Sequence, residues 1–221
     1  MNRLFVSKSL TLGRLTLALF AIIAAAALPV CVAAAPPPLA EKPLPRTDKI
    51  KFKNEAGKAV LSLKLKDDGG KLVDGDEKEL ARYTRSENKI KVKDAEDKVL
   101  GYVVIASEKL RLETADQKTE LFSLQRQADG DWKLEDPQQT RIYTIKKREY
   151  GAEIEDPQKN SLYKVKAKSG KTSLRNAADK TVYHTDETIS PAAMSCLGLD
   201  KITDLRLRAA LLFAIDHAPK K

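Results

Sequence analysis

A repeated segment of about 20 residues constrains the fold of this chain more than any other feature. Residues 133–146 read KLEDPQQTRIYTIK, and residues 153–166 read EIEDPQKNSLYKVK. The two segments share Glu-Asp-Pro-Gln at the same offset, followed by an aliphatic residue and a tyrosine. Residues 174–183, LRNAADKTVY, repeat the same frame. A period of this length indicates that one supersecondary unit is used several times.

Weaker copies of the unit precede these three. They are residues 50–61 (IKFKNEAGKAVL), residues 90–102 (IKVKDAEDKVLGY) and residues 110–122 (LRLETADQKTELF). Residues 71–83, KLVDGDEKELARY, are compatible with a degenerate copy. All of them alternate apolar residues, then place Asp or Asn with Gly, Pro or Asp, and then resume apolar residues.

Each unit is predicted to form a β-hairpin. Alternation with a period of two, as in Ile50-Lys51-Phe52-Lys53, gives a strand with one buried face. The Asx-containing segments supply turn residues, and we expect turns near residues 55, 95, 116, 138, 158 and 178. Six clear hairpins predict a mainly β domain of about twelve antiparallel strands, in a barrel or a sandwich.

The C-terminal segment, residues 200–217, departs from this pattern. It reads DKITDLRLRAALLFAIDH, contains no Pro or Gly, and is rich in good helix formers. We expect Asp200 or Thr203 to cap the start of a helix. The stretch Ala209 to Ile215 is apolar at seven successive positions. A helix that is apolar all round has to be enclosed on most sides, and this one is too short to be a good membrane span.

The N-terminal segment has the composition of a secretory signal. Residues 1–14 hold three basic groups and no acidic one, and residues 15–35 hold no charge. Cleavage after Ala34 would leave a Pro-rich spacer, residues 35–48, before a domain of residues 49–218. An uncleaved anchor and lipidation at Cys31 are the two alternatives. All three predict an exported domain that is periplasmic, extracellular or anchored on the outer side of the cytoplasmic membrane.

Three features together resemble the tubby-like group, which includes the LURP-one-related proteins and the phospholipid scramblases. They are hairpins of the type IKVKDAEDKVLGYV, a mid-chain tryptophan strand (DGDWKLED) and the closing segment TDLRLRAALLFAID. The resemblance covers about residues 48–217. It implies a twelve-stranded barrel threaded by the C-terminal helix, here residues 200–217, and a role in contact with lipid. The chain differs in being exported and in lacking the cysteine-rich stretch of the scramblases.

Residue patterns typical of catalysis or metal binding are scarce. The two histidines, His184 and His217, have no cysteine or carboxylate cluster at ligand spacing, so we expect no metal site. A lone cysteine before an apolar helix, here Cys196, is more typical of a core residue than of a nucleophile. The chain contains neither a GxSxG nor a GxGxxG motif. We therefore expect no enzymatic activity and no cofactor.

The charge of the chain suggests a partner more than a reaction. Without residues 1–35, there remain 37 basic and 31 acidic residues, an excess spread along the chain. Lysines recur beside the expected turns, and equivalent turns gather at the ends of a barrel, where they could form a basic rim for phosphate headgroups. These candidate ligand-binding residues are Lys58, Lys98, Lys118, Lys159 and Lys180. Lysines that are merely solvated are the alternative interpretation.

Two functions follow as hypotheses. The first is a non-enzymatic envelope protein that contacts phospholipid or another anionic surface. The second is a structural or interaction module that binds an envelope protein, for instance by strand addition, and has no lipid ligand. Nucleic acid is not expected as a partner. The tyrosines that recur every 20 residues, Tyr143, Tyr163 and Tyr183, are expected to pack in register within the barrel.

Overall fold

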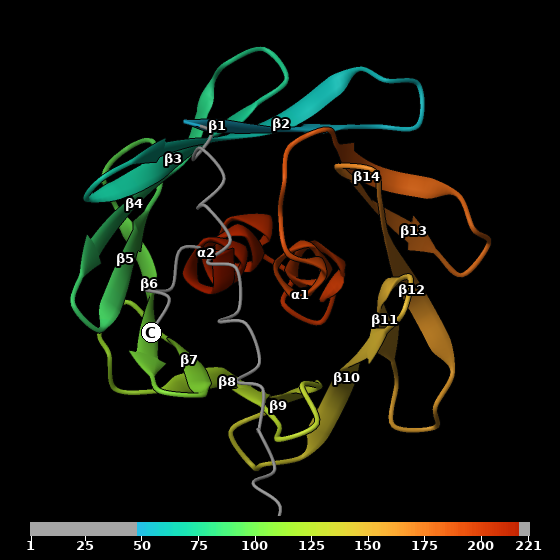
Figure 1. Ribbon diagram of the computed structural model, residues 1–221. Coiled ribbons are helices and arrows are strands. Elements are labelled where there is room, and N and C mark those ends of the chain that lie inside the picture. Colours follow the sequence, from blue (N-terminus) through green and yellow to red (C-terminus); the bar gives the residue numbers. More distant parts are fainter. Residues whose placement is uncertain (1–47, 217–221) are drawn as a thin grey trace, which may run out of the picture. The chain divides into compact units, whose positions relative to one another are not determined.

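The computed structural model describes residues 48–216, in which antiparallel strands form one closed barrel (Figure 1). The strands are β1 (Lys49–Lys53), β2 (Ala59–Lys66), β3 (Gly69–Asp74), β4 (Glu79–Ser86), β5 (Lys89–Lys93), β6 (Val99–Ala106), β7 (Lys109–Glu113), β8 (Glu120–Arg126), β9 (Trp132–Glu135), β10 (Arg141–Arg148), β11 (Gly151–Glu155), β12 (Ser161–Lys168), β13 (Lys171–Asn176) and β14 (Thr181–Thr185). Each strand pairs with its neighbours along the chain, and β1 pairs with β14 to close the ring. The predicted signal peptide, with its cleavage site and Cys31, lies outside the described residues.

The described part of the chain holds fourteen strands, so the expected number of about twelve was too low. The six expected turns are all present, and the additional hairpin is β3–β4, whose sequence is the degenerate copy at residues 71–83. This copy was obscured because β3 begins with Gly69 and Gly70, which interrupt the alternation of apolar and polar residues. The mainly β barrel built from repeated hairpins is confirmed.

One turn geometry recurs in six of the seven hairpins of residues 48–216 and explains the repeated letters. In β5–β6, the carboxylate of Asp94 accepts a hydrogen bond from the backbone N–H of Lys98 at 2.8 Å, and the Asp94 N–H donates to the Lys98 carbonyl at 2.9 Å. The same side-chain acceptor stands at Asn54, Asp74, Asp136, Asp156 and Asn176. The β7–β8 turn is one residue longer, and there the hydroxyl of Thr114 accepts from the Thr119 N–H at 3.3 Å. The fourth residue of each turn has a positive φ, and these residues are Gly57, Glu77, Asp97, Gln117, Gln139, Lys159 and Asp179. A left-handed residue after a turn creates the bulge that closes such hairpins.

The barrel has two distinct ends because its strands alternate in direction. The seven hairpin turns lie at one end, which we call the turn end: residues 54–58, 74–78, 94–98, 114–119, 136–140, 156–160 and 176–180. The opposite end, which we call the loop end, carries the connections between hairpins: residues 67–68, 87–88, 107–108, 127–131, 149–150 and 169–170. Side chains alternate between the interior and the outer surface, as in β5, where Ile90 and Val92 are buried between partly exposed lysines.

Helices fill the interior of the barrel. Helix α1 (Pro191–Ser195), the 3-10 turn η1 (Cys196–Gly198) and helix α2 (Leu205–Asp216) follow β14, and Figure 1 shows both helices within the ring of strands. In α2, Leu207 and all residues from Ala209 to Ala214 are buried. The expectation of an apolar C-terminal helix is therefore confirmed. No helix in residues 48–216 combines the length and the apolar character that crossing a membrane requires.

The start of this helix differs from the expectation. Within the described residues α2 begins at Leu205 rather than at residue 200, and Asp204, instead of Asp200 or Thr203, caps it. The Asp204 carboxylate accepts from the Arg206 N–H at 2.8 Å, and its carbonyl accepts from Leu207 at 3.1 Å. Helix α1 was not predicted, because five residues are too few to show a helical period.

Candidate functional site

The five predicted lysines all lie at the turn end of the barrel. Each is exposed, and none of their ammonium groups forms an ion pair with another residue in 48–216. Lys58, Lys98 and Lys180 are the last residues of their turns, whereas Lys159 occupies the left-handed position, with φ of 67°. The barrel therefore brings together at one end side chains that are far apart in the sequence. Their role as a headgroup rim stays a prediction.

Carboxylates outnumber lysines at this end. The seven turns contain six lysines and eleven acidic residues, and the acidic ones are Glu55, Asp74, Asp76, Glu77, Asp94, Glu96, Asp97, Asp116, Asp136, Asp156 and Asp179. Several acids bind cations of the strands: hydrogen bonds from Lys49 and Lys64 lower the pKa of Glu77 to about 2. The potential at the turn end is therefore mixed, and the five lysines do not form a uniformly basic ring.

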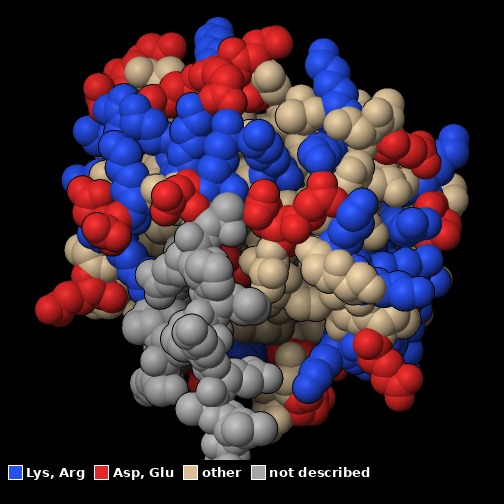
Figure 2. All heavy atoms as spheres, turned by 45° about the horizontal axis from the view of Figure 1, so that its top comes forward, with Lys and Arg blue, Asp and Glu red and all other residues tan. Residues whose placement is uncertain are grey.

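The outer surface near β1 also mixes the two signs of charge. Basic residues face one another in register across five strands: Lys49, Lys64, Lys71, Arg82 and Lys93. Three acidic side chains bind this row, namely Glu77, Glu79 and Asp97. Figure 2 shows basic and acidic side chains interleaved over this side of the molecule. Exposed pairs of this kind contribute little to stability and leave no strong field for an anion.

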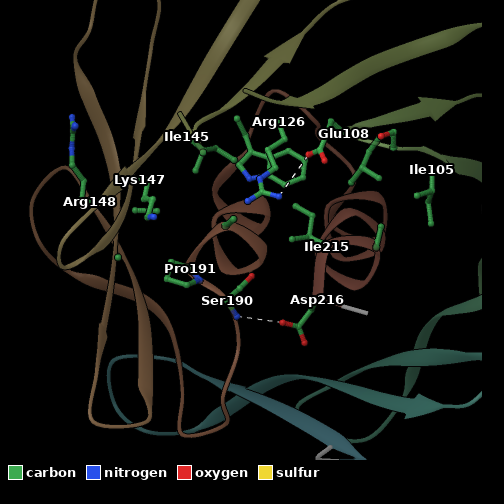
Figure 3. A pocket seen from close by; sticks show the side chains of 18 residues that line it. Ile105, Glu108, Arg126, Ile145, Lys147, Arg148, Ser190, Pro191, Ile215 and Asp216 are labelled. Carbon is green, nitrogen blue, oxygen red and sulfur yellow. Dashed lines mark hydrogen bonds and ion pairs between the residues drawn. The ribbon is translucent and has the colours of Figure 1, made fainter. Parts of the chain in front are cut away.

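A cavity of about 730 Å³ opens at the loop end, the end away from the predicted lysines. It lies between the wall from β6 to β11 and the ends of both helices (Figure 3). Its apolar lining consists of Ile105, Leu110, Trp132, Ile145, Ala152, Pro191, Ala192, Ala214 and Ile215. The size falls within the range of about 300–1,000 Å³ that is typical of small-molecule sites.

Charged side chains stand around the mouth of this cavity. Arg126, at the end of β8, pairs with Glu108 at 3.7 Å, and Figure 3 shows the two side chains side by side. Lys147 lines the mouth as well, and its ammonium group has no ion pair among residues 48–216. Arg148 is engaged elsewhere, because its guanidinium binds Glu153 at 2.9 Å and Glu155 at 2.7 Å.

The helix ends form the other side of the mouth. A carboxylate oxygen of Asp216, the last described residue of α2, accepts a hydrogen bond from the backbone N–H of Ser190 at 3.3 Å. Ser190 in turn caps α1, since its hydroxyl accepts from the Ala193 N–H at 3.1 Å. Figure 3 places the Ser190 and Asp216 pair across the cavity from Arg126. Arg126 and the helix-end carboxylate therefore lie on different sides of the opening.

Sequence reasoning missed this site because it considered lysines of the turns only. Strand alternation supplies a signal that could have found it. Along β10, Ile145 faces the interior and Lys146 faces outward, so Lys147 returns to the interior side at the rim. Arg126 relates in the same way to buried Leu124 of β8. A basic residue at the last inward-facing position of a strand therefore predicts a charged mouth of the barrel.

A tyrosine cluster at the turn end has a structural explanation. The hydroxyl of Tyr143 donates to the Asp200 carboxylate, and the hydroxyl of Tyr163 donates to the same group at 3.3 Å. Burial and the neighbouring Asp200 raise the pKa of both phenols. These contacts fasten the segment between η1 and α2 to strands β10 and β12.

In the part of the chain that the structure describes, the nucleophilic and metal-binding residue types are not gathered into a site. Cys196 is buried in η1, and burial raises the pKa of its thiol, so it is a poor nucleophile. His184 pairs in register with Lys53 at the junction of β1 and β14. Within residues 48–216 no three or more His, Cys, Asp or Glu side chains lie close enough together to hold a metal ion.

Comparisons with known proteins give little further guidance. No family model matches the chain, and no curated protein matches it. A protein of Arabidopsis thaliana with an X-ray structure is similar over 71% of this chain and 92% of its own, with 10% sequence identity and a TM-score of 0.40. A likeness this distant assigns neither a fold nor a function.

Proposed function

We propose that the protein is an exported, non-enzymatic envelope protein that contacts anionic lipid. The observation that supports this most is the loop-end cavity, where apolar walls meet cations at a mouth. Lipids combine an acyl chain, which gains free energy by leaving water, with a charged headgroup that stays at the surface. A cavity with apolar walls and a cationic opening matches both parts of such a molecule.

The described surface outside the cavity offers no apolar patch for a bilayer, which favours contact with lipid through the mouth of the cavity. Among residues 48–216, Tyr150 is the one large apolar side chain that is exposed, at 37%. Proteins that insert an apolar patch into a bilayer display a larger contiguous one. Contact with lipid would therefore combine attraction between charges with access of a lipid to the cavity.

The proposal of export rests on residues 1–34, and the relationship to the tubby-like group rests on the sequence pattern. The barrel has fourteen strands in the described residues, whereas that group has twelve. We propose that the relationship lies in a shared architecture, in which β-hairpins surround a C-terminal helix.

A second candidate function is that of a protein-interaction module that acts by strand addition. The specific observation is the junction of β1 and β14, which pair through a single residue pair, Lys53 with His184. Other neighbouring strands pair through four to six residue pairs. Sheet edges with free backbone groups can accept an extended peptide.

Vesicle flotation separates the two functions. The processed form of the protein that cells export would be mixed with vesicles of anionic lipid or of zwitterionic lipid, at low and at high salt. The lipid proposal expects flotation with the anionic vesicles and weaker flotation at high salt, because salt screens exposed charges. Absence of flotation under all four conditions would leave the interaction module as the better candidate.

A further inference from the structure

We propose that the loop-end cavity binds one long-chain fatty acid, with the chain between the barrel wall and the helices and the carboxylate at Lys147 and Arg126. This inference deepens the proposed function and rests on it. The ligand is a single-chain monoanion, and its carboxylate lies at the loop end of the barrel, opposite the lysines expected from the sequence.

The volume favours one chain over two. A cavity of about 730 Å³ holds on the order of twenty groups the size of a water molecule, each about 30 Å³. That capacity suits a single chain of about sixteen carbons, because a methylene group is similar in size to a water molecule. A diacyl phospholipid would fill the cavity with one chain and leave the other in water.

The lining explains why an acyl chain would be held. Trp132 of β9 and Ile145 of β10 are cross-strand partners on the inner wall, and Ile215 of α2 faces them from the helix side. Charged groups are confined to the mouth, as described above. An apolar wall with a few polar groups that fix orientation is the usual composition of a small-molecule site.

The charges favour a monoanion. Glu108 offsets part of the charge of Arg126, and Glu153 with Glu155 bind Arg148, so among residues 48–216 Lys147 is the cation of the mouth that forms no ion pair. A carboxylate needs one positive charge and can also accept a forked contact from Arg126.

The single tryptophan of the chain provides the readout. Trp132 lines the cavity, so a bound chain changes the surroundings of the only indole, and its emission should shift and saturate when palmitate is added below the concentration at which palmitate aggregates. Saturated fatty acids of increasing length should bind about fourfold more tightly for each added methylene until the cavity is full. Palmityl alcohol, which lacks the charge, should bind about tenfold more weakly than palmitate.

Matched variants test the placement. Lys147→Ala should weaken palmitate binding about tenfold, whereas Lys133→Ala, which removes a cation beside Trp132 on the outer face of β9, should leave binding unchanged. Ala192→Phe fills the cavity from α1, where Ala192 is only half-buried, and should abolish the emission shift while the melting temperature stays unchanged. Binding of palmitate by Ala192→Phe at the affinity of the unmodified protein would overturn the proposal.

Two further outcomes bear on the ligand. If the palmitate titration leaves the emission of Trp132 unchanged, the cavity is not a fatty-acid site. Tighter binding of a lysophosphatidic acid of the same chain length would overturn the carboxylate assignment in favour of a phosphate headgroup.

Flotation distinguishes failure of this inference from failure of the proposed function. Flotation with anionic vesicles but no response to palmitate would refute the fatty-acid site alone. A response to palmitate without flotation would refute membrane contact and leave the site. The absence of both would refute both.

Discussion

The hydroxyl of Tyr83, on β4, donates a hydrogen bond to the backbone carbonyl of Arg206, in the first turn of α2, at 3.0 Å. The same tyrosine stacks its ring on Phe213, two turns further along the helix, with the ring centroids 5.8 Å apart. One side chain of the barrel wall therefore holds the enclosed helix at two points. The helix and the hairpins consequently share one core.

We expect Tyr83→Phe to lower the free energy of unfolding by about 1–2 kcal/mol. The substitution keeps the stacked ring but leaves the Arg206 carbonyl without this donor. Urea denaturation would measure the change. Tyr102→Phe is a matched control, because the Tyr102 hydroxyl has no hydrogen bond among the described residues, and its effect should stay within about 0.5 kcal/mol.

Leu212 tests whether α2 is part of the core. Its side chain is fully buried, so Leu212→Ala should cost about 2–5 kcal/mol, measured in the same denaturation experiment. Leu212→Asp should prevent folding, because it would bury a charge without a partner. Deletion of residues 200–221 should remove the shared core of the hairpins. A truncated protein that remains monomeric and unfolds cooperatively would show that the helix is dispensable.

The hairpin repeat was predictable because it is local. The Asx residue that accepts from a backbone N–H four residues later, such as Asp156 with Asn160, lies within the repeated letters themselves. The enclosed helix was predictable for a related reason, since an unbroken apolar stretch leaves few alternatives.

The cavity was not predictable, because it depends on contacts between distant segments. Arg126, Lys147 and Ser190 meet only when the barrel closes around α1 and α2. The lysines of the turns were easier to find because they repeat, but repetition reflects the turn as much as any ligand. Their neighbouring carboxylates, such as Asp97 beside Lys98, belong to the same repeat.

The left-handed turn position gives a prediction about two residues. Gly57 has φ of +79°, and a Cβ there would meet no atom within 4 Å, so Gly57→Ala should cost about 1–2 kcal/mol through backbone strain alone. Lys159 occupies the same position of another turn with φ of 67°, so Lys159→Gly should be neutral or slightly stabilising. Thermal unfolding followed by circular dichroism would compare them. A loss of stability in Lys159→Gly equal to that in Gly57→Ala would contradict this account of the turn.

Alkaline pH should destabilise the barrel, and Tyr83 should carry part of the effect. Burial, followed by the charge of Asp204, raises the pKa of the Tyr83 phenol above its ordinary value. In the unfolded chain the same phenol has a pKa of about 10. Below that pH both states keep the proton, and the contribution to stability is fully present. Above it the unfolded chain releases the proton while the folded protein retains it, so the free energy of unfolding decreases by about 1.4 kcal/mol per pH unit for this group.

The measurement is urea denaturation at several pH values between 8 and 11. The free energy of unfolding of Tyr83→Phe should be lower at pH 8 but should fall less as the pH rises. The reason is that this variant lacks a phenol whose loss of a proton is coupled to unfolding. Burial also raises the pKa of Tyr143 and Tyr163, so some alkaline loss should persist in Tyr83→Phe. Equal slopes for the unmodified protein and Tyr83→Phe would mean that this phenol titrates alike in both states, contrary to its position between β4 and α2.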